Sequence, residues 1–375
     1  MKSVCIVTAI PATINAFLKD HILNLSKYYN VTVITTVTEF ANVQVADNVR
    51  VISLNIQREI RVFKDLNSLF ALIALFRKEK FDLVLSVTPK AGFLSALAGR
   101  LTGVKNRIHW FTGQVWVTQT GFRRGLLKSV DKVLALCISD ALIDSPSQFE
   151  FLVNEKVLKA EKGVVLGAGS ICGVDLNQFK FDDCARRLYR KKIGVTDGDK
   201  VILFLGRLNN DKGVLDLINS FHQVVLQINN LHLVFVGQDE INIEKTIVNN
   251  GLSHDKIHFT GNTLEPEKWF SIADVFSLPS YREGFGSSVI EAAAVGLPAI
   301  VSRIYGLTDA VVDGETGLMH QVGNIEEMSG AIKKIIEDDS LRTYLGENAR
   351  KRAVACFNQE YVSNLLLCYV SERLK

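Results

Sequence analysis

Short apolar runs rich in β-branched residues alternate with longer amphipathic stretches in the first half of the chain. The short runs have the length and composition of buried strands, at Val4–Ala9, Val31–Thr36, Leu83–Val87, Arg107–Phe111, Ala135–Ile138 and Val164–Leu166. Apolar residues at helical spacing predict helices at Ala16–Lys27, Leu66–Lys78 and Ala91–Leu101. This alternation is typical of parallel βαβ units.

The same alternation starts again after the glycine-rich segment Gly167–Gly173, which we interpret as a hinge. Strands are predicted at Val201–Leu205, Leu231–Val236, Ile257–Phe259, Val275–Leu278 and Ala299–Ser302. Helices are predicted at Val214–Gln227, Trp269–Ala273, Ile325–Glu337 and Ser340–Ala355. The pattern predicts an α/β protein with two Rossmann-like domains, residues 1–170 and 171–357, facing each other. Because open α/β sheets bind ligands beyond the carboxyl ends of their strands, the cleft between the domains is the expected site.

The composition is that of a globular protein, with 47% hydrophobic and 22% charged residues in a chain of 375. The six cysteines are scattered, which indicates reduced thiols of a cytosolic protein and neither a disulfide framework nor a zinc site. No apolar run is long enough to span a bilayer, and the first is too short for a signal peptide. Residues 1–170 hold 21 basic and 13 acidic residues, against 22 and 27 in the remainder. The basic half predicts an anionic partner.

The segment Glu283–Pro298 joins a glycine-bracketed loop to an alanine-rich helix. We expect Ser287 to be the N-cap, with its hydroxyl accepting from an amide of the first turn. Free amides at a helix start bind anions, and the flanking carboxylates of Glu283 and Glu291 suit the hydroxyl groups of a ribose or a sugar. The segment therefore predicts a pocket for a phosphorylated, hydroxyl-rich ligand. The alternative is an ordinary strand–loop–helix unit with two surface carboxylates.

The loop Gly206–Gly213 follows the first strand of the second half and contains Arg207 and Lys212. A guanidinium fork beside a mobile ammonium group suits a diphosphate, and the alternative is a solvated charged loop. Gly237 and Asn262 follow the next two strands, so their backbone groups are expected at the same sheet edge, where a base could bind.

Together, three segments of the second half resemble a retaining glycosyltransferase of family 4. They are Gly206–Gly213, Pro279–Pro298 and Asp313–Gly317, and the resemblance extends over Val201–Gly317. It implies a GT-B fold and a nucleotide-diphosphate sugar as donor, with UDP as the expected nucleotide and GDP as the alternative.

The resemblance also implies a role for each matching residue. Arg207 and Lys212 would hold the diphosphate, and Glu291 would bind the ribose hydroxyls. Glu283 would contact the donor sugar beside the reacting centre, which makes it the first catalytic candidate. The other donor-binding candidates are Gly206, Gly237, Asn262, Gly284, Phe285, Gly286 and Ser287.

The implied reaction is transfer with retention at the anomeric carbon, without a metal ion or another cofactor. Arg207, Lys212 and the helix amides would oppose the negative charge that develops on the leaving diphosphate. The adjacent pairs Asp182-Asp183 and Asp338-Asp339 are expected on the surface, and His254 and His258 lack a third ligand nearby, so no metal site is expected. The alternatives are a phosphorylase or a nucleotide-sugar epimerase of the same fold, or a non-catalytic nucleotide-binding scaffold.

The stretch Arg107–Trp116 resembles a segment of family members that assemble bacterial capsule or O-antigen. The resemblance implies four acceptor-side candidates, His109, Thr112, Gly113 and Gln114. His109 is either a second catalytic candidate or a core histidine on a strand. Asn15, after the first strand, is a further acceptor-side candidate in a loop that lacks the family's usual glycine pair.

The acceptor implied by this resemblance is a saccharide on undecaprenyl diphosphate, at the inner face of the cytoplasmic membrane. Two clusters suit docking on that anionic surface, and the alternative is a pair of ordinary amphipathic helices. They are Arg58, Arg61 and Lys64 around Val62 and Phe63, and Arg123, Arg124 and Lys128 around Leu126 and Leu127. The basic half lacks a nucleic-acid-binding motif, so no nucleic-acid partner is expected. As in other GT-B proteins, the final helix, Glu360–Leu374 within residues 358–375, is expected to pack on the first domain.

Overall fold

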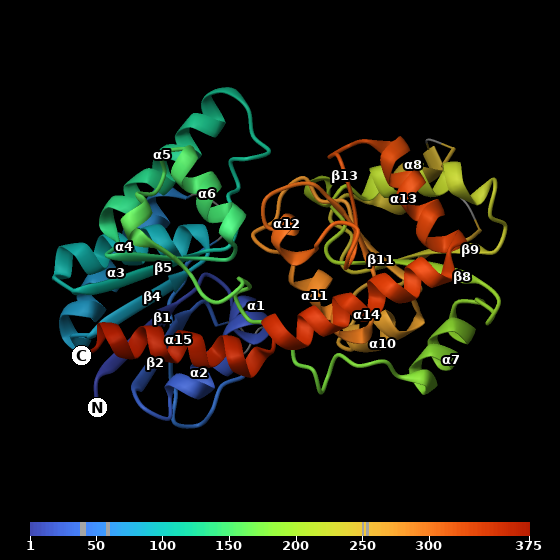
Figure 1. The fold of residues 1–375 in the computed structure, drawn as a ribbon. Coiled ribbons are helices and arrows are strands. Elements are labelled where there is room, and N and C mark those ends of the chain that lie inside the picture. Colours follow the sequence, from blue (N-terminus) through green and yellow to red (C-terminus); the bar gives the residue numbers. More distant parts are fainter. Residues whose placement is uncertain (38–42, 58–60, 250, 253–254) are drawn as a thin grey trace. The chain divides into compact units, whose positions relative to one another are not determined.

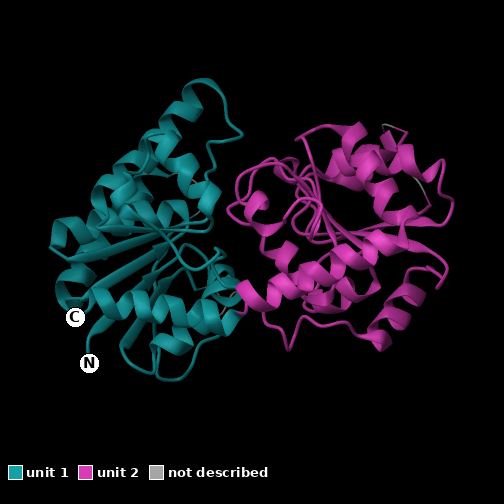
Figure 2. Ribbon diagram, in the orientation of Figure 1, with its two compact units in different colours: residues 1–173, 359–375 teal, residues 174–358 magenta. Residues whose placement is uncertain are grey.

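The computed structural model describes residues 1–37, 43–57, 61–249, 251–252 and 255–375. The chain forms two compact units (Figures 1 and 2), the first Met1–Gly173 with Gln359–Lys375 and the second Val174–Asn358. It leaves the first unit at the end of the glycine-rich segment, where Gly167, Gly169 and Gly173 have positive φ angles. It returns to that unit for its last helix.

A seven-stranded parallel sheet forms the centre of the first unit, in the order β3-β2-β1-β4-β5-β6-β7. Its strands are β1 (Ser3–Val7), β2 (Asn30–Thr35), β3 (Arg50–Ser53), β4 (Leu83–Val87), β5 (Asn106–Phe111), β6 (Asp140–Ile143) and β7 (Gly163–Val165). Side chains of β1 alternate between two hydrophobic clusters, with Val4 and Ile6 in one and Cys5 and Val7 in the other. Both faces of the sheet are therefore covered, as is usual for a parallel sheet.

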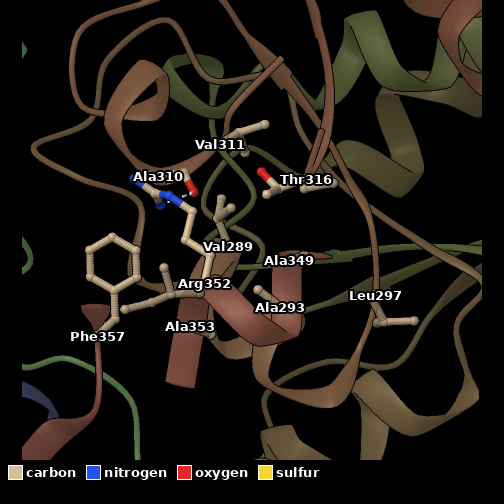
Figure 3. A pocket seen from close by; sticks show the side chains of 12 residues that line it. Val289, Ala293, Leu297, Ala310, Val311, Thr316, Ala349, Arg352, Ala353 and Phe357 are labelled. Atoms are coloured by element: carbon tan, nitrogen blue, oxygen red, sulfur yellow. Dashed lines mark hydrogen bonds between the residues drawn. The ribbon is translucent and has the colours of Figure 1, made fainter. Parts of the chain in front are cut away.

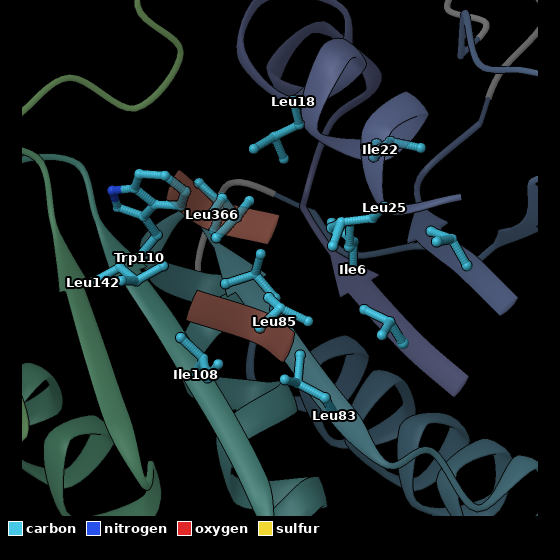
Figure 4. Close-up of a cluster of buried hydrophobic side chains, with 14 of the residues drawn as sticks. Ile6, Leu18, Ile22, Leu25, Leu83, Leu85, Ile108, Trp110, Leu142 and Leu366 are labelled. Atoms are coloured by element: carbon cyan, nitrogen blue, oxygen red, sulfur yellow. The ribbon is translucent and has the colours of Figure 1, made fainter. Parts of the chain in front are cut away.

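The helices of the first unit pack on both faces of this sheet. They are α1 (Pro11–Thr13), a π-helix (Ile14–Leu18), α2 (Lys19–Leu25), α3 (Val62–Glu79), α4 (Pro89–Thr102), α5 (Gly121–Cys137), α6 (Pro146–Asn154), a 3-10 helix (Ala160–Lys162) and α15 (Gln359–Arg373). Helix α15 packs against α2. Leu366 of α15 joins Leu18 and Ile22 in one buried cluster with Ile6 and Leu85 of the sheet (Figure 4). The last helix thus completes the core of the first unit.

The second unit contains a six-stranded parallel sheet in the order β10-β9-β8-β11-β12-β13. Its strands are β8 (Lys200–Leu205), β9 (Leu231–Val236), β10 (Ile257–Phe259), β11 (Val275–Leu278), β12 (Ala299–Ser302) and β13 (Gly317–His320). Its helices are α7 (Asp183–Lys192), a 3-10 helix (Asn210–Lys212), α8 (Val214–Val225), α9 (Ile243–Asn249), α10 (Pro266–Ile272), α11 (Ser287–Val295), α12 (Leu307–Ala310), α13 (Ile325–Glu337) and α14 (Asp339–Cys356).

Both sheets reverse their strand order beside their first strand, since β1 lies between β2 and β4 and β8 lies between β9 and β11. This doubly wound arrangement is Rossmann-like, so the predicted α/β class with two such sheets is confirmed. Ligands of these folds bind where the strand order reverses, at the carboxyl ends of the strands. In the second unit that position lies between the loops that follow β8 and β11.

The prediction of a strand at Ala135–Ile138 is wrong. These residues end α5, and the strand begins at Asp140. A short apolar run fits a strand or a buried helical turn equally well, and here Leu134, Ala135 and Cys137 form the buried side of α5.

Two short edge strands, β3 and β13, were not predicted, and neither were α6, α7, α9 and α12. Most of β3 is exposed, so its sequence lacks the apolar run that marks a buried strand. The predicted helix Ala16–Lys27 starts earlier, at Pro11, and includes the π-helical turn. In the described part of the chain, no helix is both long and apolar enough to cross a membrane.

Candidate functional site

Two loops meet at the carboxyl ends of the neighbouring strands β8 and β11. The loop after β8 runs to Gly213, whose φ angle is +65°, and a Cβ atom there would clash with the carbonyl oxygen of Pro279. Glycine is therefore needed both for the left-handed backbone and for the close approach of the second loop. Backbone bonding continues this contact, because the Tyr281 amide donates to the Asp211 carbonyl at 2.8 Å.

Charged side chains bind the same two loops together. Lys212, in the loop after β8, forms an ion pair with Glu283, in the loop after β11. The Ser280 hydroxyl donates to the same Glu283 oxygen at 2.8 Å. Beside this pair, Arg282 donates to the Asp211 carboxylate at 2.7 Å. The structure thus brings together Lys212 and Glu283, two site residues predicted from distant parts of the sequence.

The ends of β8, β9 and β10 meet through glycine backbone. The Gly206 amide donates to the Val236 carbonyl at 2.9 Å, and the Gly237 amide donates to the Gly261 carbonyl at 2.9 Å. A Cβ atom on Gly237 would clash with the carbonyl oxygen of Gly206. Asn262 follows directly and is exposed. These three predicted donor-side positions therefore lie along one sheet edge.

Arg207 lies in the loop after β8 and forms an ion pair with Glu240, in the loop after β9. Its NH1 group donates to both carboxylate oxygens of Glu240, at 2.9 and 3.1 Å. Arg207 and Lys212 each have a carboxylate partner, and each side chain also retains some exposure to solvent.

The start of α11 differs from the prediction. Gly286, with a φ angle of +89°, is the N-cap, and Ser287 is the first helical residue. Among the described residues, no side chain forms a capping hydrogen bond at the start of α11. The prediction that Ser287 is the N-cap is therefore wrong. The left-handed Gly286 turns the chain into the helix instead. A Cβ atom on Gly306, before α12, would clash with the carbonyl oxygen of Gly284, so α12 begins directly against this loop.

Phe285 occupies the middle of this loop but faces the interior. Its ring is buried and lies 5.1 Å from that of Phe357. Only the backbone of Phe285 is therefore positioned to contact a ligand.

Glu291 lies one turn into α11, on the same helix face as Ser287. Burial, followed by the nearby charge of Glu267, raises the pKa of the Glu291 carboxyl to about 7. Val289 and Ala293 lie about 200° further round the helix and line a separate cavity of about 10 Å³ with Arg352 (Figure 3). That cavity has room for one water molecule at most, and Glu283 is not among the residues that line it.

His109, in β5, is buried beneath α4. A ring nitrogen, Nδ1, lies 3.0 Å from the Ser86 hydroxyl, and the ring packs edge-on against Phe111 at 4.6 Å. A Cβ atom on Gly92 of α4 would clash with the ring. Burial lowers the pKa of His109 to about 3, so the ring is neutral at physiological pH. Of the two interpretations drawn from the sequence, this environment favours a core histidine on a strand.

The other acceptor-side candidates lie after β1 and β5. The Asn15 side-chain oxygen accepts from the Gln44 amide at 2.9 Å. Gln114 is buried, and its side-chain oxygen accepts from Gln148 at 3.2 Å. Thr112 and Gly113 are partly exposed at the end of β5, and Gly113 has a φ angle of +115°.

The sequence did not single out several residues that shape these two edges. The two predicted loops contain Ser280, Arg282 and Asp211, and the loop after β9 contains Glu240. Their polar side chains and their positions after strands could have identified them as site residues. Thr88 ends β4 with a φ angle of +75°, and its hydroxyl accepts from the Ala9 amide at 3.3 Å. A threonine in this conformation is strained, and the sequence gives no sign of it.

The described residues contain no group of three or more His, Cys, Asp or Glu side chains that could hold a metal ion. His254 lies outside the described residues. His258 lies 2.9 Å from the ring of His232 and stacks on it. All six cysteines are free thiols.

Two family models match the chain, one on each unit. A model described as "Glycosyl transferases group 1" matches residues 185–352, and one described as "Glycosyl transferase 4-like" matches residues 7–132. The capsular polysaccharide biosynthesis glycosyltransferase CapM of Staphylococcus aureus is 32% identical over 308 residues, covering 82% of this chain and 80% of the relative. The chain belongs to glycosyltransferase family 4.

Two further similarities describe this glycosyltransferase. The UDP-Gal:α-D-GlcNAc-diphosphoundecaprenol α-1,3-galactosyltransferase of Escherichia coli is 28% identical over 321 residues, covering 80% of this chain and 78% of the relative. The structure of sucrose-phosphate synthase from Thermosynechococcus elongatus superposes with a TM-score of 0.82 at 21% identity, covering 99% of both chains. The fold is therefore GT-B, and the family resemblance drawn from the sequence is confirmed.

Proposed function

We propose that this glycosyltransferase moves a sugar from a UDP-sugar to a saccharide carried on a lipid diphosphate, retaining the anomeric configuration and using no metal ion. The observation behind the proposal is the pair of loops after β8 and β11, where Lys212, Glu283 and Ser280 are in contact. The relative from E. coli, which takes UDP-galactose and a diphosphoundecaprenol-linked acceptor, supports this choice of substrates.

The leaving group explains the need for positive charge at these loops. Cleavage of the donor's glycosidic bond leaves an electron pair, and with it negative charge, on the β-phosphate oxygen. Lys212 supplies a mobile ammonium group and Arg207 a planar fork, and both follow the same strand. Positive groups beside the leaving oxygen stabilise its developing charge, which is the role that a divalent ion fills elsewhere.

The two carboxylates have different roles in this proposal. Glu291, half-buried on the same face of α11 as Ser287, would accept hydrogen bonds from the two ribose hydroxyls. Glu283 receives hydrogen bonds from Lys212 and Ser280, which fix its orientation. It would accept from a hydroxyl of the donor sugar next to the reacting carbon. We assign it this contact and no covalent intermediate.

A membrane-bound acceptor fits the exposed apolar residues of the first unit. Phe63 of α3 is 84% exposed and Phe122 of α5 is 85% exposed, and Val62 and Phe70 of α3 are also exposed. Helix α4 packs against both α3 and α5, so the helices that carry these residues flank α4. Exposed aromatic side chains beside basic ones such as Arg123 suit the interface of an anionic bilayer.

Part of the basic cluster predicted for docking has another role. Lys128 and Arg124 pair with Glu155, at 2.5 and 3.5 Å, and both lie over the ring of Trp116. These two cations therefore stabilise α5 on its own unit. Arg58 lies outside the described residues. The docking proposal therefore depends on the aromatic residues and on Lys64 and Arg123.

Docking can be tested by vesicle sedimentation with Phe63→Ser combined with Phe122→Ser. Loss of two aromatic anchors should reduce binding to anionic vesicles about tenfold or more, because burying one such side chain contributes about 1.5–3 kcal/mol. Phe181→Ser, at an exposed phenylalanine of the second unit, is the matched control and should bind normally. Equal binding by the double variant would reject this surface, and equal binding to neutral vesicles would remove the electrostatic part.

The transfer itself is tested by incubating the protein with labelled UDP-sugars and a lipid-diphosphate-linked N-acetylglucosamine, followed by NMR of the product. The proposal expects label in the lipid fraction with the donor's anomeric configuration. Conversion of donor without acceptor would indicate an epimerase, and dependence on orthophosphate would indicate a phosphorylase. Binding of UDP without any turnover would indicate a scaffold, and each of these results would overturn the proposal.

A further inference from the structure

The guanidinium group proposed to hold the donor diphosphate is already bound to a carboxylate. Both oxygens of Glu240 accept from NH1 of Arg207, at 2.9 and 3.1 Å. Asn209, two residues further along the same loop, donates to Glu240 at 2.8 Å. A carboxylate with two oxygens on a guanidinium occupies the kind of place that a phosphate group would take.

Backbone pairing holds Glu240 next to Arg207. The Leu208 amide donates to the Gln238 carbonyl at 2.8 Å, and the Glu240 amide donates to the Leu208 carbonyl at 3.0 Å. The segments that follow β8 and β9 therefore continue the pairing of the two strands. Directly before Glu240, the Asp239 carboxylate accepts from the Ile243 amide at 2.7 Å, at the start of α9. The position of Glu240 is set by the sheet and not by a loose loop.

We propose that Glu240 competes with the donor diphosphate for Arg207 and so weakens the binding of UDP. This inference rests on the proposed function of the β8 loop. When a diphosphate approaches Arg207, Glu240 either gives up its contact or remains as a negative charge beside the phosphates. Both outcomes oppose binding, and both assist the departure of UDP after transfer, when release of the product completes the reaction cycle.

The second ion pair of the site is built differently. Each carboxylate has a second donor, Ser280 for Glu283 and Asn209 for Glu240. The difference lies in exposure, because Glu283 is 13% exposed, whereas Glu240 is 31% exposed and its partner Arg207 is 46% exposed. A more exposed carboxylate turns into solvent at lower cost when it loses its partner. Glu240 is thus the exchangeable carboxylate, and Glu283 stays in place for the donor sugar.

The competition predicts an effect that depends on the charge of the ligand. Dissociation constants for UDP, UMP and uridine are measured by calorimetry at pH 8 for the wild type and for Glu240→Gln. The variant should bind UDP about two- to fivefold more tightly, which corresponds to the usual contribution of an exposed ion pair. The gain should be smaller for UMP, absent for uridine, and reduced at high salt.

Two further variants complete the test. Glu337→Gln removes the same charge from an exposed pair with Lys333 on α13, and it should bind all three ligands as the wild type does. Arg207→Ala should bind UDP more weakly, and adding Glu240→Gln to it should bring a smaller gain than the same change brings to the wild type. If Glu240→Gln binds UDP as the wild type does, competition is rejected. If it binds more weakly, Glu240 is a positioning residue for Arg207.

The same titrations separate this inference from the proposed function. If the wild type binds neither UDP nor GDP, which is titrated in parallel, the donor assignment fails, and the inference fails with it. If the wild type binds UDP and transfers sugar but Glu240→Gln has no charge-dependent effect, only the inference fails.

Discussion

The two sheets of this glycosyltransferase share a topology but differ in what their carboxyl ends present. In the second unit, the loops after β8 and β11 bring Lys212 and Glu283 into contact. In the first unit, the ends of β1 and β5 lead to Asn15, Thr112 and Gly113, which are uncharged, while His109 lies in the interior. The same backbone arrangement therefore presents two kinds of loop side chain.

This difference suggests a division of work. A charged edge stabilises the charge that develops on a leaving diphosphate. The uncharged edge, meaning the residues after β1 and β5, suits the hydroxyl groups of an acceptor saccharide. Substitutions at the charged edge should therefore change the rate of transfer and the affinity for the donor, whereas those at the uncharged edge should change the affinity for the acceptor.

The largest effect is expected for Lys212→Ala. Removing the ammonium group leaves the developing phosphate charge opposed by Arg207 alone, so turnover should fall by about 100-fold or more. Steady-state transfer kinetics measure this, with melting temperature and circular dichroism to confirm folding. Lys268→Ala, which removes a lysine paired with Glu265 on the same unit, is the control and should retain full activity. Equal turnover in Lys212→Ala and the control would contradict the role of the charged edge in stabilising the leaving diphosphate.

A smaller effect is expected when Glu291 is protonated. Only its carboxylate form accepts from both ribose hydroxyls, and its pKa is raised to about 7. Affinity for the UDP-sugar should therefore be full above pH 7 and decline as the pH falls below it, by up to about tenfold per pH unit. Calorimetry with a UDP-sugar, whose diphosphate does not titrate in this range, measures the decline. Glu291→Gln should bind more weakly and independently of pH; an unchanged pH profile in this variant would contradict the ribose role.

Thr112→Val tests the uncharged edge with almost no change of shape. Loss of one hydroxyl should raise the KM for the acceptor about two- to tenfold, the usual range for a single hydrogen bond, while the KM for the donor stays constant. Initial rates at varied acceptor and donor concentrations separate the two constants. A change confined to the KM for the donor would show that Thr112 acts on the donor and not on the acceptor.

The smallest effect on transfer is expected for His109→Ala. The ring is buried against Ser86 and Phe111, so its loss should lower the free energy of unfolding by about 1–3 kcal/mol through a cavity and an unpaired hydroxyl. Denaturant unfolding measures this loss. The folded variant should keep a near-normal turnover number. A loss of turnover by about 100-fold at unchanged stability would identify His109 as catalytic after all.

Much of the fold follows from hydrophobic periodicity. The buried strands Leu83–Val87, Leu231–Val236 and Val275–Leu278 have the predicted bounds, because a continuous apolar run has sharp ends. Edge strands such as β3 lack that signal, since one side is exposed. The run at Ala135–Ile138 was wrongly predicted as a strand, because a buried helical turn has the same composition as a short strand.

The site could be predicted only in part. Residue types and their place in the alternation of strands, loops and helices led to the prediction of Arg207, Lys212, Glu283 and Glu291 as site residues. The pairing of Lys212 with Glu283, 71 residues apart, follows from the order of the strands in the sheet, which one sequence does not reveal. The burial of His109 depends on the packing of α4 over β5, and the N-cap at Gly286 depends on a backbone angle.

The central claim is that protein cations, and no divalent ion, stabilise the leaving diphosphate. Initial rates of transfer from the UDP-sugar to the lipid-linked acceptor, measured in excess EDTA and in added Mg²⁺ or Mn²⁺, test it directly. The account predicts equal rates under all of these conditions. Loss of turnover in EDTA that either metal restores would contradict it.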